Sequence, residues 1–298
     1  MPLPSFIAYI SLEKNYSPHT VKAYKDDLLS FQTFCTENFE DDNLVSTNYM
    51  QIRSWIVSLV ERGVSNRTIN RKVSSLKAFY KFLMKSKQLN EDPLVKHKAL
   101  KVGKRIQVPF SQKEVNEVLD SLTTDTDFES LRNKLIVELF YSTGMRRAEL
   151  IDLKISDIDL ANETVKVLGK RNKERYIPLL KSVQQTVGDY LKIRNVIETE
   201  ANQLLITTKG NKIYGTLVYR VINGYFSRVS SKVKKSPHVI RHSFATHLLN
   251  EGADLNSVKE LLGHSSLAST QVYVNNSLNE LKKVYNQAHP RSSKNESE

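Results

Sequence analysis

Hydrophobic side chains in the first hundred residues recur at spacings of three and four, which is the pattern of amphipathic helices. A short first helix is predicted around residues 6–10, and further helices follow at about 18–34, at 48–61 and from residue 66 onward. Ser17 is expected to cap the second helix, because Pro18 then occupies the first helical position, where its missing N–H is not needed. The sequence therefore predicts a helical first half.

The second half mixes helical and strand patterns. Residues 132–160 predict a buried helix, a turn at Gly144 and a second helix. Alternating apolar positions in 164–168 and 175–179 predict two strands joined as a hairpin by "GKRNKE", after which helical patterns resume. The predicted fold class is mainly α with a small antiparallel β-sheet. The final residues, 291–298, predict a disordered tail.

Composition changes this picture mainly through charge. The chain has 44 Lys and Arg against 32 Asp and Glu, a formal net charge of +12, which indicates a polyanionic partner and favours nucleic acid over a membrane surface. The single cysteine, Cys35, excludes an intramolecular disulfide and a cysteine-based zinc site. We find no secretory leader and no apolar run that could span a bilayer, so the sequence predicts a cytoplasmic protein without a membrane partner.

Two basic stretches indicate where a nucleic acid could bind. Residues 66–87 predict a helix whose polar face carries cations and no acid, whereas a solvated helix usually mixes signs to gain i, i+4 pairs. A solubilising face is the alternative interpretation. The stretch 98–108 is basic and unpatterned, which suits a strap along a DNA backbone. The residues predicted to contact DNA in these stretches are Arg67, Arg71, Lys72, Lys77, Lys101, Lys104 and Arg105.

Four separated segments hold side chains that packing alone does not explain: "TGMRRAEL", the hairpin lysine after Gly169, "SPHVIRHSFATHLLNEG" and "LLGHSSLASTQVYV". If these segments converge, Arg146 and Arg241 would form a fork around a tetrahedral phosphate. Lys170 beside two arginines is expected to have a lowered pKa, which suits proton donation to a leaving oxygen.

Histidines and a tyrosine complete this candidate site. His238 lies i, i+3 from Arg241 on one helical face, and His264 precedes Tyr273 by nine residues. The histidines could supply hydrogen bonds and a base near neutral pH. Tyr273 is the candidate nucleophile, because a phenoxide can attack phosphorus and leave a covalent ester. None of these steps requires a metal or another cofactor.

Two other classes of function compete with this one. His238 and His242 stand i, i+4, the spacing of two zinc ligands on a helix, but position 239 is Val rather than Glu and Arg241 would repel a cation. A non-catalytic helix-turn-helix regulator could use the segment from residue 248 to 274. Such a regulator would not need Arg146, Lys170 and Tyr273 in register. His247 shares a face with apolar residues and is predicted to be a core histidine.

The motifs, their order and their separations resemble those of the tyrosine recombinases, and most nearly the Xer-type chromosome dimer resolvases. The resemblance covers essentially the whole chain. It implies DNA cutting and rejoining through a 3′-phosphotyrosyl link and a Holliday junction, without metal or ATP. It also implies roles for individual residues: phosphate binding by Arg146, Arg241 and His264, proton donation by Lys170, a base or structural partner in His238, orientation by Glu149 and nucleophilic attack by Tyr273.

The resemblance further implies an architecture. A helical, SAM-like core-binding domain is expected at 1–97, a basic linker at 98–108 and the catalytic domain at 109–290, together forming a C-shaped clamp on DNA. The partners implied are double-stranded DNA with two recombination sites, a homo- or heterotetramer with a similar recombinase, and a septal DNA translocase. An integrase of a mobile element remains an alternative with the same chemistry.

Further expectations concern the hairpin cations, Arg147, the residues after Tyr273 and the C-terminal segment. Lys173 and Arg175 in the hairpin are interpreted as DNA-backbone contacts, and Arg147 as a surface or DNA contact. Tyr273 is followed by "VNN", where many relatives have a Thr-His pair. The segment "LNELKKVYNQAHP" predicts an amphipathic helix with an exposed apolar stripe that docks on a neighbouring protomer.

Overall fold

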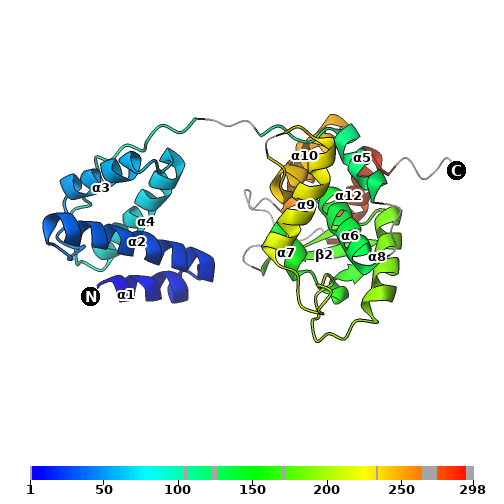
Figure 1. Ribbon diagram of the computed structural model, residues 1–298, viewed down its shortest axis with the longest axis horizontal. Coiled ribbons are helices and arrows are strands. Elements are labelled where there is room, and N and C mark those ends of the chain that lie inside the picture. Colours follow the sequence, from blue (N-terminus) through cyan, green and yellow to red (C-terminus); the bar gives the residue numbers. More distant parts are fainter. Residues whose placement is uncertain are drawn as a thin grey trace. The chain divides into compact units, whose positions relative to one another are not determined.

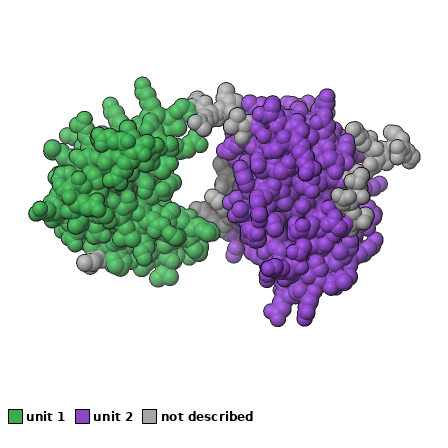
Figure 2. All heavy atoms as spheres, in the orientation of Figure 1, with its two compact units in different colours: residues 1–105 green, residues 106–298 purple. Residues whose placement is uncertain are grey.

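The computed structural model describes residues 2–103, 107–122, 127–169, 172–232, 234–263 and 274–292, and only the backbone of 274–280. The chain forms two compact units, residues 1–105 and residues 106–298 (Figure 2). The described elements are helices and one small antiparallel sheet (Figure 1), which confirms the predicted fold class. Within these residues, no helix is both long and apolar enough to cross a membrane.

The described elements of the first unit are helices. α1 (Pro2–Ala8) continues as a π-helical segment, η1 (Tyr9–Glu13), and is followed by α2 (Pro18–Phe39), α3 (Tyr49–Glu61) and α4 (Asn66–Lys85). Ser17 caps α2 as predicted, since its Oγ accepts a hydrogen bond from the Thr20 N–H at 3.2 Å. The apolar stripes of these helices meet in one core, which includes Phe6, Phe31, Trp55, Leu76 and Phe79.

The basic face of α4 is partly neutralised by an acid from α2. Asp27 is 2% exposed and accepts hydrogen bonds from Arg71 (2.6 and 3.0 Å), Lys72 (3.1 Å) and Ser75 (2.8 Å). Burial raises the pKa of Asp27, but the hydrogen bonds from Arg71, Ser75 and Lys72 outweigh it and leave the pKa below its usual value. Two of the side chains predicted to contact DNA therefore already form ion pairs inside the unit.

The start of the predicted linker is fixed to α4. The Asn70 side chain donates to the Leu100 carbonyl at 2.8 Å and accepts from the Leu100 N–H at 2.9 Å. Asn66 donates to the Lys101 carbonyl at 2.8 Å. These bonds satisfy the backbone of an extended segment that has no neighbouring strand. Lys101 and Arg67 are exposed on this side of the first unit, whereas Lys104 and Arg105 lie outside the described residues.

The second unit places helices around a three-stranded sheet. It begins with α5 (Gln112–Ser121), α6 (Phe128–Thr143), α7 (Arg147–Asp152) and the short η2 (Ile155–Asp157). After the sheet come α8 (Lys181–Arg194), α9 (Gly215–Val229), α10 (Pro237–Asn250), α11 (Leu255–Leu262) and α12 (Val274–Ala288).

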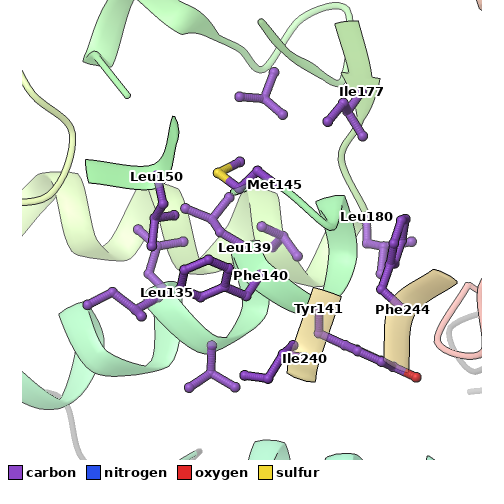
Figure 3. Packing of buried hydrophobic residues seen from close by; sticks show 14 of the residues in the cluster. Leu135, Leu139, Phe140, Tyr141, Met145, Leu150, Ile177, Leu180, Ile240 and Phe244 are labelled. Atoms are coloured by element: carbon purple, nitrogen blue, oxygen red, sulfur yellow. The ribbon is translucent and has the colours of Figure 1, made fainter. Parts of the chain in front are cut away.

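α6 is the central helix of this unit and contacts α5, α7, α8, α9 and α10. Leu135, Leu139 and Phe140 are completely buried on it, and Figure 3 shows them packed with Ile240 of α10 and Leu150 of α7. Because α6 is buried nearly all round, its C-terminal end lies inside the unit rather than in solvent. The residues that follow it are thereby held in fixed positions.

The sheet consists of β1 (Ile158–Asp159), β2 (Thr164–Leu168) and β3 (Glu174–Pro178), in that order and antiparallel. The predicted hairpin is confirmed, with Val165 opposite Ile177, although β3 begins one residue earlier than expected. β1 was not predicted, because two residues are too few to show an alternating pattern.

The expected exposed stripe on the C-terminal helix is wrong for this chain. Leu281, Tyr285 and Ala288 of α12 are buried in the core of the second unit, against α10 and β3. The side chain of Leu278 lies outside the described residues. Burying an apolar stripe removes it from water, so these three side chains are covered within the chain itself, and docking on a neighbouring protomer stays a prediction.

We predict that Asp27→Asn destabilises the first unit by about 2–3 kcal/mol, because two cations lose their buried carboxylate. The pKa of Asp27 is lowered by folding, so its contribution is present above about pH 4 and is lost as the pH falls through the folded pKa. Trp55, the only tryptophan in the chain, lies in this core, so urea titrations followed by its fluorescence report on the first unit.

Asp26→Asn is the matched control, because Asp26 pairs with Lys22 on the surface, with the side chains 55% and 73% exposed. It should change the stability by less than about 1 kcal/mol. Equal losses in the two variants would contradict a structural role for the Asp27 ion pairs.

Candidate active site

Glu149 caps the start of α7 by accepting two hydrogen bonds from Arg146. The Glu149 carboxylate accepts the Arg146 backbone N–H at 2.7 Å and the Arg146 Nη1 at 2.8 Å. Arg146 Nη2 also donates to the Gly263 carbonyl at 3.1 Å. Glu149 is buried, while the Arg146 side chain is 33% exposed. Glu149 and the Gly263 carbonyl therefore fix the guanidinium on one side, while its other side is open to solvent.

Gly144 makes this arrangement possible at the end of α6. Its φ of +58° is left-handed, and its N–H donates to the Phe140 carbonyl at 3.0 Å. A Cβ at this position would lie 2.4 Å from a ring carbon of Phe244. Only glycine allows the chain to turn here and lead directly into Arg146.

Arg241 is buried on α10, with only 8% of its surface exposed, and is fixed by two helix ends. Its Nη1 donates to the Gly144 carbonyl at 2.6 Å, and its Nη2 donates to the Leu262 carbonyl at 2.7 Å. These carbonyls stand at the C-terminal ends of α6 and α11, where the helix dipole favours a cation. Burial and then the positive charge of Arg146 lower the pKa of Arg241 to about 10, so it stays charged at neutral pH.

Arg175 of β3 belongs to the same cluster, which corrects our expectation of a surface contact with DNA. It donates to both Glu149 oxygens at 3.1 and 2.7 Å and to the Leu261 carbonyl at 2.9 Å, and its side chain is 10% exposed. The physical reason is strand alternation, because Arg175 points to the same side of β3 as the buried Ile177. That spacing was visible in the sequence and could have indicated an inward arginine.

The cluster carries more positive charge than it neutralises. Arg146, Arg175 and Arg241 supply three positive charges, and Glu149 supplies one negative charge. Burial raises the pKa of Glu149, but hydrogen bonds and charge from Arg175 and Arg146 outweigh it, and the carboxyl is ionised. Two positive charges remain, which makes the site suited to an anion.

The residues directly before Lys170 and His264 show where two further predicted site residues attach. Lys170, His264 and Tyr273 lie outside the described residues, but their neighbours are described. A Cβ on Gly169 would lie 3.8 Å from a Glu149 oxygen, and the Gly263 carbonyl binds Arg146. The backbone positions directly before Lys170 and His264 are therefore at the arginine cluster.

The histidines of α10 have different settings. His238 is exposed one turn before Arg241, and burial followed by the charges of Lys234 and Arg241 lowers its pKa. His242 is also exposed. His247 is buried and its Nδ1 lies 2.9 Å from the Tyr141 hydroxyl, which confirms it as a core histidine.

Other predicted contacts lie on the surface. Lys173 and Lys77 are exposed. Arg147 is exposed as well, with its guanidinium carbon 3.3 Å from the position that a Cβ on Gly215 would occupy. In the described part of the chain, no three His, Cys, Asp or Glu side chains are grouped so that they could hold a metal ion.

Both units match profiles of known protein families. The Phage integrase family profile matches residues 109–280, and the profile of the phage integrase N-terminal SAM-like domain matches residues 3–87. Tyrosine recombinase XerC of Bacillus subtilis is 37% identical over 298 residues, which cover 97% of this chain and 96% of that protein. Tyrosine recombinase XerC of Bacillus licheniformis is 38% identical over 301 residues, with 98% and 97% covered.

Solved structures agree on the fold. XerH bound to its difH substrate before cleavage gives a TM-score of 0.68 at 21% identity, covering 95% of this chain and 81% of that chain. The Tn1549 transposon integrase bound to circular intermediate DNA gives 0.71 at 20% identity, covering 94% and 98%. The chain therefore belongs to the phage integrase family of tyrosine recombinases. It is a site-specific recombinase, and its long sequence matches within that family include the XerC proteins.

We predict that Glu149→Gln lowers the free energy of unfolding of the catalytic unit by about 2–4 kcal/mol, because two guanidinium groups lose their shared counter-charge. The pKa of Glu149 is lowered by folding, so this loss is full above the unfolded value near pH 4.5 and shrinks as the pH falls through the folded pKa. The measurement is urea denaturation followed by circular dichroism at several pH values.

Asp152→Asn on the same helix is the control, because Asp152 pairs with Lys212 on the surface, with side chains 65% and 41% exposed. It should cost less than about 1 kcal/mol. A Glu149→Gln loss that does not diminish in acid would show that charge pairing is not its cause.

Proposed function

We propose that the arginine cluster binds the scissile phosphate of DNA and that Tyr273 attacks it. The observation that carries this proposal is the cluster of Arg146, Arg175 and Arg241 around the buried Glu149, with two surplus positive charges. A phosphodiester has one negative charge, and it approaches two in a pentavalent transition state. The surplus therefore matches the charge that develops during the reaction, which is the interaction that accelerates it.

The hydrogen bonds of the cluster support a fork of two arginines. A guanidinium has five N–H donors. Arg241 uses donors on Nη1 and Nη2 to bind the carbonyls of Gly144 and Leu262. Arg146 is held in the same way by Glu149 and the Gly263 carbonyl. These bonds fix the orientation of each group before DNA arrives, and the other donors can bind the phosphate oxygens.

In the proposed step, phosphorus exchanges its bond to the 5′ oxygen for a bond to Tyr273. The Tyr273 oxygen forms a bond to phosphorus as its proton passes to a base, for which His238 is suited because its lowered pKa keeps it neutral at pH 7. The bond to the 5′ oxygen breaks, and Lys170 donates a proton to that oxygen. His264 binds the same phosphate and Glu149 orients the arginines. The reverse attack by the 5′ hydroxyl of a partner strand rejoins the DNA and frees Tyr273.

The DNA contacts and the assembly belong to the same proposal. In this proposal a core-binding domain (1–97), a basic linker (98–108) and a catalytic domain (109–290) all contact double-stranded DNA. Exposed cations of the first unit, Arg67, Lys77 and Lys101, bind its backbone, while Arg71 and Lys72 are bound mainly to Asp27. Recombination of two sites then needs four protomers, as a homotetramer or with a second recombinase.

We further propose a chromosomal role. The identity with XerC proteins over almost the full chain supports resolution of chromosome dimers at a dif-like site before cell division. A septal DNA translocase is proposed as the activator. A mobile-element integrase would use the same chemistry, and a transposon integrase is among the similar folds. The DNA site that is cut distinguishes these two roles.

The test uses a nicked duplex that carries the dif-like sequence of the host chromosome, so that cleavage traps the covalent intermediate. We predict a protein–DNA adduct that persists in EDTA and is abolished by Tyr273→Phe. The wild-type yield, measured by denaturing gel electrophoresis, should fall steeply with salt when DNA is limiting, because phosphate contacts release counterions.

Tyr214→Phe, at an exposed tyrosine outside the cluster, is the control and should retain the adduct. An adduct that survives Tyr273→Phe, or that needs a divalent metal, would overturn the assignment. Adducts on transposon ends but not on the dif-like sequence would support the mobile-element role.

A further inference from the structure

The last turn of α6 is capped by the C-terminal helix. The final four carbonyls of an α-helix have no partner within the helix. In α6 the Phe140 carbonyl accepts from the Gly144 N–H, but the next two carbonyls are bound by side chains from the last turn of α12 and from the residue directly after it. The Tyr285 hydroxyl donates to the Ser142 carbonyl at 2.8 Å, and His289 Nε2 lies 3.2 Å from the Tyr141 carbonyl.

Both donors are fixed in the core. Tyr285 is fully buried and His289 is 1% exposed, and the two stand i, i+4 with ring centroids 5.1 Å apart. His289 Nδ1 accepts the Arg291 N–H at 3.2 Å, so Nε2 carries the proton that it donates to the carbonyl. Burial lowers the pKa of His289 to about 4, which keeps this neutral tautomer at neutral pH.

The capped turn is the same one that positions the arginine cluster. Ser142 stands two residues before Gly144, whose carbonyl accepts Arg241, and four residues before Arg146. A shift of the Ser142 carbonyl would therefore move a hydrogen-bond partner of Arg241 and the backbone that carries Arg146. α12 also begins at Val274, directly after Tyr273. One helix thus connects the proposed nucleophile to the carbonyl end that orients both arginines.

We propose that Tyr285 and His289 are positioning residues, which complete the phosphate site by capping α6 when α12 is docked. This inference rests on the proposed function of the cluster. Cleavage then depends on two side chains that do not touch DNA. Undocking of α12 would leave two buried carbonyls unpaired and loosen Arg146 and Arg241, so the nucleophile and its phosphate site are assembled or lost together.

The experiment compares Tyr285→Phe and His289→Leu, which remove the donors, with His289→Gln, which keeps one at Nε2. We expect the first two to reduce single-turnover cleavage of saturating nicked DNA by about 10- to 100-fold, with much smaller changes in DNA affinity, and His289→Gln to recover most of the rate. In a double-mutant cycle, Tyr285→Phe should add little to the loss caused by Arg146→Ala.

A second readout needs no DNA. Amide hydrogen exchange at residues 144–150 should become faster in Tyr285→Phe and His289→Leu, while exchange in α9 stays unchanged. Tyr190→Phe is the control, because Tyr190 is another buried tyrosine whose hydroxyl binds backbone, accepting from the Ile206 N–H at 3.2 Å, away from the end of α6. It should leave both the cleavage rate and exchange at 144–150 unchanged.

Two results would overturn the proposal. One is unchanged exchange at 144–150 in folded Tyr285→Phe and His289→Leu. The other is a cleavage loss that Tyr190→Phe reproduces or that adds in full to Arg146→Ala. If wild-type protein forms no adduct at all, the proposed function fails instead, and the exchange measurement still tests the cap.

Discussion

Three guanidinium groups lie close to a single buried carboxylate at the centre of the catalytic unit, and the rest of that unit is arranged around this charge imbalance. Glu149 binds Arg146 and Arg175, while Arg241 has carbonyl oxygens as its partners. Confining like charges in a poorly hydrated site is unfavourable unless an anion completes it. Glu149 and the backbone carbonyls hold the three arginines in place, and the phosphate proposed as their ligand would complete the charge balance.

Helix ends solve the problem of holding these cations in place. The carbonyl ends of α6 and α11 meet at Arg241, and the α11 end also contacts Arg146 and Arg175. Left-handed glycines, Gly144 and Gly263, end both helices and let the side chains approach. The capping of α6 by α12 extends the same principle, since a buried carbonyl needs a donor from elsewhere in the chain. Fold and chemistry thus depend on the same backbone oxygens.

Local patterns in the sequence predicted the helices and the hairpin, because periodicity and helix-start signals are short-range. Arg146, Glu149 and Arg241 were indicated by their motifs and by the family resemblance. Partnerships between distant segments were beyond those patterns. Asp27 lies on the apolar stripe of α2, and only tertiary structure shows that it pairs with Arg71. Arg175 looked like a surface cation, although its register with Ile177 indicated burial. The stripe of α12 was visible, but which protein surface covers it was not.

In the proposed reaction, the surplus positive charge of the cluster neutralises the charge of a phosphate. Replacing the scissile phosphate by a neutral methylphosphonate removes that charge from the DNA and leaves the protein intact. On the phosphate substrate, single-turnover cleavage by wild type should be about 1,000-fold faster than by Arg241→Ala, as for the loss of a preorganised electrostatic group. On the methylphosphonate, this ratio of the two rates should be smaller by a factor of at least about ten. An equal ratio on both substrates would contradict the account, because Arg241 would then act without sensing the charge.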